Sequence, residues 1–207
     1  MSTAITGWTD THCHIHDDKM ASVPAESLQR ARDAGVERFV VIGTDAPTCE
    51  QAIAIASQHS DVWATVGLHP HDATQGTDSI LPYVTQPRVI AIGECGLDFN
   101  RMFSPKDQQI RVFSAQLSLA KQLQKAVYLH ERDAFPDQIG LLKEHQIDLG
   151  IAHCFTGDAG QLKAYLDLGL YIGITGWLCD ERRATLLQDA LQYLPLDRLI
   201  LETDAPY

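Results

Sequence analysis

The sequence of 207 residues lacks any long hydrophobic run, so it predicts no membrane-spanning helix. Its N-terminus has no basic region followed by an apolar one, and we therefore expect no secretory signal. The five cysteines are odd in number and include no Cys-x-x-Cys pair. This usage is typical of free thiols in a reducing compartment rather than of a disulfide framework. We expect a cytoplasmic protein.

Basic residues are scarce, with 16 Lys and Arg against 27 Asp and Glu and a net charge of -11. This balance excludes a protein that coats duplex nucleic acid through a broad basic surface. It leaves open a nuclease whose phosphate contacts are confined to one metal-lined pocket. No linker, repeat or low-complexity segment interrupts the chain, so we expect a single domain over residues 1–207.

Short apolar or β-branched runs alternate with longer stretches of helical periodicity. The predicted strands are Gly7–His12, Arg38–Gly43, Val62–Gly67, Val89–Gly93, Ala126–His130, Gly150–His153, Tyr171–Ile174 and Leu199–Glu202. The predicted helices are Pro24–Ala34, Pro47–Gln58, Asp78–Thr85, Pro105–Leu123, Ala134–His145, Asp158–Leu168 and Arg182–Tyr193.

Strict strand–helix alternation predicts parallel strands joined by crossover helices, and eight strands favour a closed (β/α)8 TIM barrel of the metal-dependent hydrolase type. A doubly wound open sheet is the alternative. No helix is predicted after the eighth strand, so we expect a barrel that lacks its last helix. We expect a monomer, with self-association through the uncovered part of the barrel as the alternative.

The pair His12 and His14 stands at the end of the first predicted strand. Successive side chains of a strand point to opposite faces, so these two imidazoles lie on one face and form half of a divalent-metal site. Other metal-binding side chains also stand at or after the carboxyl ends of strands, where barrel active sites are built. The predicted metal ligands are His12, His14, Glu94, His130, His153 and Asp204.

Six nitrogen and oxygen ligands are enough for two divalent ions, and a carboxylate such as Glu94 can bridge them. Phosphate chemistry and carboxylates favour Mg²⁺, while the histidines leave Zn²⁺ and Mn²⁺ as alternatives. Arg132 lies on the same strand face as His130 and can bind phosphate bidentately. Thr156 leads into a helix start that can receive an anion. Together these features predict a phosphate ester substrate.

Seven ordered motifs carry a resemblance to a known family. They are Asp10-Thr-His-Cys-His, Gly67-Leu-His-Pro-His, Ala91-Ile-Gly-Glu-Cys-Gly-Leu-Asp-Phe, His130-Glu-Arg-Asp-Ala, His153-Cys-Phe-Thr-Gly, Ile172-Gly-Ile-Thr-Gly and Glu202-Thr-Asp-Ala-Pro-Tyr. Over essentially the whole chain, the sequence resembles the TatD family of metal-dependent deoxyribonucleases. The resemblance implies an amidohydrolase-type barrel and a Mg²⁺-dependent 3′→5′ exonuclease acting on DNA, with roles in DNA repair or fragmentation.

The family's metal ligands match the six residues named above. The resemblance further implies that Glu94 bridges the two ions and that Asp204 is the base or orients the attacking water. We expect His69, Arg132 and Thr156 to bind the substrate phosphate. Two other hypotheses stay open from the sequence: a metal-dependent deacylase or lactonase on the same barrel, and a truncated, inactive barrel that only binds metal or a partner.

Overall fold

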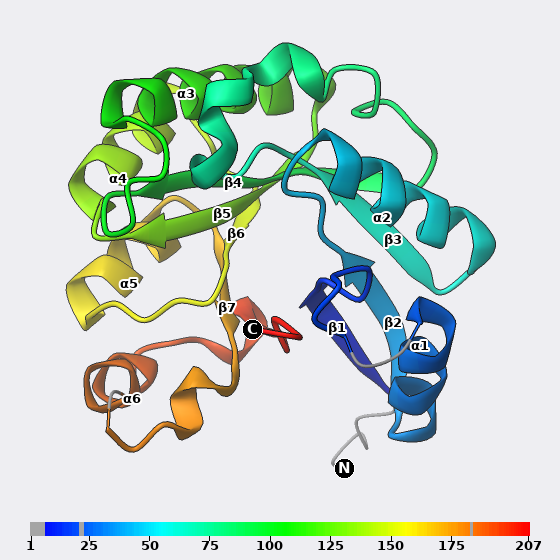
Figure 1. The fold of residues 1–207 in the computed structure, drawn as a ribbon. Coiled ribbons are helices and arrows are strands. Elements are labelled where there is room, and N and C mark those ends of the chain that lie inside the picture. Colours follow the sequence, from blue (N-terminus) through cyan, green and yellow to red (C-terminus); the bar gives the residue numbers. More distant parts are fainter. Residues whose placement is uncertain (1–6, 21–22, 183) are drawn as a thin grey trace.

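The computed structural model describes residues 7–20, 23–182 and 184–207. Its eight strands follow one another in chain order around a barrel, and each neighbouring pair is parallel (Figure 1). They are β1 (Trp8–Cys13), β2 (Val36–Val41), β3 (Val62–Val66), β4 (Val89–Asp98), β5 (Ala126–Arg132), β6 (Gly150–Ala152), β7 (Tyr171–Ile174) and β8 (Leu199–Leu201). The predicted (β/α)8 barrel is confirmed. The doubly wound alternative is wrong, because the strand order never reverses.

The α-helices lie outside the ring of strands (Figure 1). They are α1 (Pro24–Asp33), α2 (Ala46–Gln58), α3 (Lys106–Leu123), α4 (Phe135–Glu144), α5 (Ala159–Asp167) and α6 (Thr185–Leu191). Local signals explain where they begin, since α1 starts with a proline and Asp45 caps α2 by accepting a hydrogen bond from the Thr48 backbone. Within the described residues, α6 precedes β8 and no helix follows that strand. No described helix combines the length and the apolar character that crossing a membrane requires.

The predicted helix Asp78–Thr85 is wrong. Between β3 and β4 the chain forms two short 3-10 helices, η1 (Pro70–Gln75) and η2 (Thr77–Ser79), and then turns. Ile80 and Val84 are buried four residues apart, which imitates the spacing of a helix face. Pro82 between them lacks the backbone donor that a helix interior needs. Two further 3-10 helices, η3 (Gly176–Cys179) and η4 (Leu196–Arg198), precede α6 and β8.

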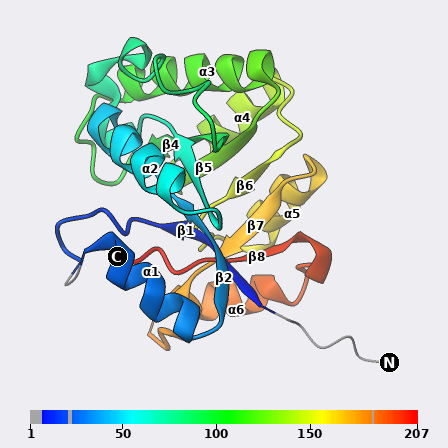
Figure 2. The same ribbon diagram turned by 90° about the vertical axis from the view of Figure 1, so that its right-hand side faces the viewer.

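The barrel closes at the carboxyl end of its strands. Within the described residues β1 and β8 share no continuous ladder, and the chain just beyond β8 makes the contacts instead. The Asp204 N–H donates to His12 O at 2.8 Å, and the His14 N–H donates to Ala205 O at 2.8 Å. Figure 2 shows this last segment, in red, running beside β1. The residues that seal the barrel are therefore the same residues that carry predicted metal ligands.

Strand β4 is longer than predicted and contains Glu94 rather than ending before it. Its pairing with β5 is irregular between Ile92 and Cys95. Gly93 and Gly96, on either side of Glu94-Cys95, have φ of 143° and 147°, in the region that favours glycine. A Cβ on either residue would collide with the backbone of β5. The two glycines thus let β4 bend and press against β5 where Glu94 enters the site.

Replacing Gly96 by alanine should lower the free energy of unfolding by about 2–4 kcal/mol, since the new Cβ meets the His130 carbonyl at an unfavourable φ. The matched control is Gly140→Ala in α4, where a Cβ meets nothing within 4 Å. That variant should gain about 0.5–1 kcal/mol from the lower chain entropy of alanine. Urea unfolding followed by tryptophan fluorescence measures both, and equal stabilities of the two variants would contradict this account of β4.

Candidate metal centre

A cavity of about 650 Å³ opens at the carboxyl ends of the strands. Most of the residues predicted for the site line it, and these are His14, His69, Glu94, His130, Arg132, His153 and Asp204. His12 lies beneath them and is fully buried. Thr156 does not line this cavity and instead borders a small separate space beside it.

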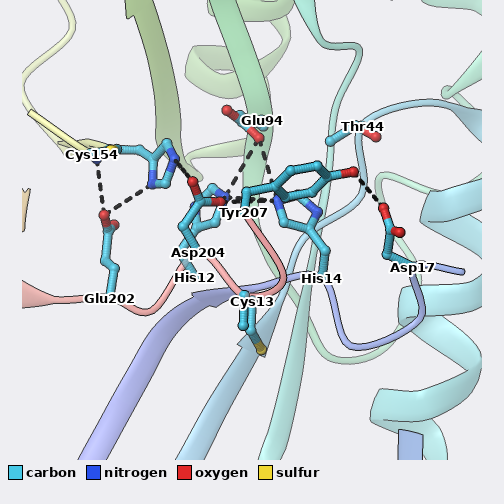
Figure 3. A network of polar contacts seen from close by, with 12 residues as sticks. His12, Cys13, His14, Asp17, Thr44, Glu94, Cys154, Glu202, Asp204 and Tyr207 are labelled. Atoms are coloured by element: carbon cyan, nitrogen blue, oxygen red, sulfur yellow. Dashed lines mark hydrogen bonds and ion pairs between the residues drawn. The ribbon is translucent and has the colours of Figure 1, made fainter. Parts of the chain in front are cut away.

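Four donor atoms converge from three separate parts of the chain (Figure 3). The Nε2 atoms of His12 and His14 are 3.1 Å apart. They lie 3.5 and 3.9 Å from Glu94 Oε2 and 3.6 and 3.5 Å from Asp204 Oδ1. Donors that share one ion at about 2.0–2.2 Å stand roughly 3–3.5 Å from one another. The cluster therefore has nearly the spacing of a coordination shell.

The second oxygen of each carboxylate faces another histidine. Glu94 Oε1 is 3.1 Å from His130 Nδ1, and Asp204 Oδ2 is 3.7 Å from His153 Nε2. Glu94 and Asp204 thus lie between the His12–His14 pair and the histidines of β5 and of the β6 end. The structure brings all six predicted ligands together around these two carboxylates.

Buried nitrogens test whether this donor set fits a metal. His12 Nδ1 is buried and has no hydrogen-bond partner among the described residues, whereas His130 Nε2 lies 3.4 Å from Asp98 Oδ2. Burial, reinforced by neighbouring His153, lowers the pKa of His12 to about 4, so its imidazole is neutral at physiological pH. Neutral imidazole is the form that binds metal ions. The buried, neutral imidazole of His12 beside the carboxylates of Glu94 and Asp204 fits a divalent cation.

Hydrogen bonding distinguishes His69 from these histidines. Its Nδ1 accepts the backbone N–H of His71 at 3.1 Å. Burial and nearby His130 hold the pKa of His69 well below its usual value, so the ring is neutral and its one proton must be on Nε2. That N–H points toward Glu94 Oε1 at 3.7 Å. This tautomer makes His69 a hydrogen-bond donor into the cavity rather than a metal ligand.

Glu202 is a buried residue to which the sequence reasoning gave no role. Its Oε2 accepts hydrogen bonds from His153 Nδ1 at 2.9 Å and from the Cys154 N–H at 3.0 Å (Figure 3). Its Oε1 accepts one from the Tyr128 hydroxyl at 2.9 Å. Burial disfavours the charged imidazolium, but Glu202 outweighs it and raises the pKa of His153 to about 9. By holding Nδ1–H, Glu202 turns His153 Nε2 toward Asp204.

A signal for Glu202 was present in the sequence. It stands two residues before Asp204, at the end of a strand, so both carboxylates were candidates for the same end of the barrel. Its partner His153, however, comes from a strand end 49 residues earlier. Only the folded arrangement shows that the contact exists.

The profile of the family described as TatD related DNase matches residues 9–207. The chain belongs to this family. The resemblance read from the seven motifs is thereby confirmed.

Individual relatives agree. An enzyme of Rahnella sp. (strain Y9602) named 3′-5′ ssDNA/RNA exonuclease TatD is 51% identical over 187 residues, which are 87% of this chain and 71% of the relative. The protein of the same name from Salmonella typhimurium is 43% identical over 204 residues, which are 96% of this chain and 78% of the relative. The crystal structure of a TatD homologue from Escherichia coli K12 superposes with a TM-score of 0.87 at 34% identity. The superposition covers 96% of this chain and 79% of the homologue.

Cys154 of this TatD-family chain lines the cavity beside His153. Its φ of 43° turns the chain after β6, and its sulfur lies 3.3 Å from the Thr175 hydroxyl. Burial raises the pKa of the thiol to about 11, so it is protonated at neutral pH. Cys154 lies beyond β6, which ends at Ala152.

The cations that line the cavity are Lys19, Arg101 and Arg132. In the described part of the chain no carboxylate lies within salt-bridge distance of any of them, although other basic residues pair readily, as in Arg32–Asp61. Arg132 stacks on Trp177, with its guanidinium carbon 5.4 Å from the ring centroid. Lys19 lies 3.9 Å above the Tyr207 ring. These positive charges are available to an anion.

Thr156 lies within 3.4 Å of Arg132, as a long hydroxyl contact to the guanidinium. The predicted anion site at the following helix start is not free. The Asp158 carboxylate caps α5 and accepts the N–H of Gln161 at 2.8 Å. An incoming anion would have to displace this cap, so the interaction left to Thr156 is through its hydroxyl.

Glu202→Gln should weaken divalent-metal binding by about 10- to 100-fold, the usual cost of losing a carboxylate behind a ligand histidine. A glutamine keeps the shape but lacks the negative charge that holds the His153 Nδ1–H and makes Nε2 a stronger ligand. Isothermal titration of Mn²⁺ into metal-stripped protein measures the change. Glu131→Gln is the control, because it removes a carboxylate from the same cavity but contacts the start of α4. An equal loss in both variants would mean that only net charge matters.

Proposed function

We propose that this protein is a divalent-metal-dependent phosphodiesterase that removes nucleotides from the 3′ end of single-stranded nucleic acid, with DNA as the expected substrate. The observation that carries the proposal is the convergence of six metal-binding side chains at a cavity that also presents three cations without a carboxylate partner among the described residues. The relatives named as 3′-5′ ssDNA/RNA exonucleases support the same polarity and substrate.

The proposed metal ligands are His12, His14, Glu94, His130, His153 and Asp204. We infer two ions, because the two oxygens of Glu94 face different histidines and can serve both. Mg²⁺ is the proposed ion, with Zn²⁺ and Mn²⁺ as the alternatives that imidazole ligands favour. When bound, such ions polarise a phosphoryl oxygen and acidify water.

Asp204 is the proposed group that orients the attacking water and takes up its proton. Burial works against its charge, but His14, His153 and His12 outweigh burial and hold the pKa of Asp204 below its usual value. The carboxylate is therefore ionised at neutral pH and accepts hydrogen bonds. Glu94 is likewise ionised, since His69, His12 and His130 outweigh burial and keep its pKa well below normal.

His69, Arg132 and Thr156 are the proposed phosphate-binding residues. His69 donates from Nε2 on one side of the cavity, and Arg132 offers a guanidinium that its contact with Trp177 orients. Thr156 acts through its contact with Arg132. Donors fixed in this way can hold a phosphodiester without reorganising when it binds.

Membership of the TatD related DNase family favours this function over a deacylase or lactonase. Hydrolases of other substrates, such as a 2-pyrone-4,6-dicarboxylic acid hydrolase from Acinetobacter baumannii, are 13% identical and share the fold alone. Rates of the wild-type protein on a phosphodiester and on an acyl ester compare the two reactions directly. Loss of both would leave the inactive barrel as the remaining hypothesis.

A monomer in the cytoplasm is our proposal for the state of the protein in the cell. All five cysteines are unpaired, and Cys13, Cys49 and Cys95 are buried, which suits a reducing compartment. The exposed side chains of Trp8 on β1 and Leu201 on β8 are the surface through which self-association would occur. Size-exclusion chromatography with light scattering decides between the two states.

Glu94→Gln should lower kcat on a 5′-labelled single strand by at least about 1,000-fold, because it removes the carboxylate shared by both histidine groups. Chelation of the wild-type protein should abolish cleavage to the same extent. Asp72→Asn is the control, since Asp72 also lines the cavity but, among the described residues, its side chain accepts a hydrogen bond from Gln75 alone. Cleavage that survives both chelation and Glu94→Gln would refute the mechanism.

Arg132→Gln should weaken strand binding and reduce the salt dependence of log K by about 0.7, the contribution of one phosphate contact on a single strand. Fluorescence anisotropy with a labelled strand measures this in a Glu94→Gln background, where the strand is not degraded. Arg111→Gln is the matched control, because Arg111 pairs with Asp107 on the exposed face of α3. Identical salt slopes for the two variants would remove Arg132 from the phosphate site.

A further inference from the structure

The turn that joins β4 to α3 is firmly anchored at the mouth of the cavity. Asp98 accepts hydrogen bonds from the backbone N–H groups of Asn100 and Arg101 at 2.9 and 2.8 Å. At the other end of the turn, the Ser104 hydroxyl donates to His71 O at 2.8 Å. The backbone of the turn is thus anchored at both ends, which fixes where its side chains emerge.

Phe103 is the most exposed aromatic side chain of this turn, with 67% of its surface accessible. Its ring centroid lies 4.8 Å from that of His71, and the planes are nearly perpendicular at 89°. His71 itself lines the cavity and is held by Asp98 at 2.7 Å. The anchored backbone therefore holds a large apolar ring in water directly beside the cavity.

A cation stands two residues before this ring. Arg101 lines the cavity, and its guanidinium makes no hydrogen bond or ion pair with any residue that the structure describes. A single exposed apolar side chain needs no explanation. Here an exposed ring and a cation stand on one anchored turn at the edge of the cavity. Two further cations without a carboxylate partner among the described residues line the same cavity.

That pattern matches the way proteins hold single-stranded nucleic acid, in which cations follow the backbone and aromatic rings stack on bases. We propose that Phe103 is a stacking platform for one unpaired nucleobase near the 3′ end, and that Arg101 contacts an adjacent phosphate. This inference rests on the proposed nuclease function and specifies how that site selects its substrate. A base that is paired inside a duplex cannot offer its face to Phe103, so the platform favours single strands.

The test pairs a protein change with a substrate change. Wild-type protein and Phe103→Ala are compared on an intact single strand, in which every base is present, and on strands that each lack one base. The abasic position is moved stepwise through the first five nucleotides from the 3′ end. On the intact strand Phe103→Ala should lower kcat/KM by at least about fivefold, the lower end of what base–aromatic stacking contributes. At one abasic position the same substitution should cost less than about twofold.

Two further variants separate stacking from other effects. Phe103→Trp should retain or improve kcat/KM on the intact strand, since it keeps an aromatic face, while Phe103→Leu should behave like alanine. Tyr193→Ala is the matched control, because Tyr193 is 70% exposed and follows α6, outside the residues that line the cavity. It should show no dependence on the abasic position.

The outcomes are distinguishable from those of the proposed function. If the wild-type protein cleaves the strand but Phe103→Ala lowers kcat/KM by the same factor at every abasic position, the stacking platform is refuted and the nuclease function is not. If Phe103→Leu matches wild type, the ring contributes only apolar bulk and the stacking proposal is also refuted. If the wild-type protein cleaves no strand with any divalent metal, the nuclease function itself fails.

Discussion

The backbone contact between β1 and the chain just beyond β8 is the constraint on which the rest of the structure depends. Two hydrogen bonds of 2.8 Å, from Asp204 N–H to His12 O and from His14 N–H to Ala205 O, close the barrel at the carboxyl ends of the strands. The same bonds set the Asp204 carboxylate 3.5–3.6 Å from the two imidazoles. Closure of the barrel therefore also brings Asp204 into the candidate metal centre. A partly folded chain that has not made this contact lacks the Asp204 contacts to His12 and His14.

This coupling explains how the protein tolerates so many ionisable groups in one place. Glu94 and Glu202 are almost fully buried, which on its own opposes their charge. Each is compensated by imidazoles that come from other strands, His130 for Glu94 and His153 for Glu202. The His130 contact needs only the β4–β5 pair, whereas His12 on β1 reaches Glu94 across the barrel at 3.5 Å, so that part of the compensation depends on closure. A divalent cation in the cluster would add to the same balance, which links ion binding to folding.

The architecture was predictable because its signals are local and repeated. Alternating short apolar runs and helical stretches predicted the barrel, and the position of polar residues after strands predicted which side chains meet. The failures have specific causes. Ile80 and Val84 imitated a helix because buried turns can share its spacing, and β4 was cut short because Gly93 and Gly96 look like strand breakers when they are in fact where two backbones touch. The role of Glu202 depends on a partner 49 residues away, which no local pattern reveals.

The distribution of charge limits what kind of nucleic acid can reach the centre. With a net charge of -11, the surface as a whole repels a polyanion, and this repulsion acts over about 8–10 Å at ordinary ionic strength. Within the cavity, Lys19, Arg101 and Arg132 have no carboxylate partner among the described residues and can attract a phosphate. A duplex lying across the surface meets mostly negative charge, whereas the end of a flexible strand can enter the cavity and reach all three cations. This distribution of charge favours the single-strand end that the proposed function requires over a duplex.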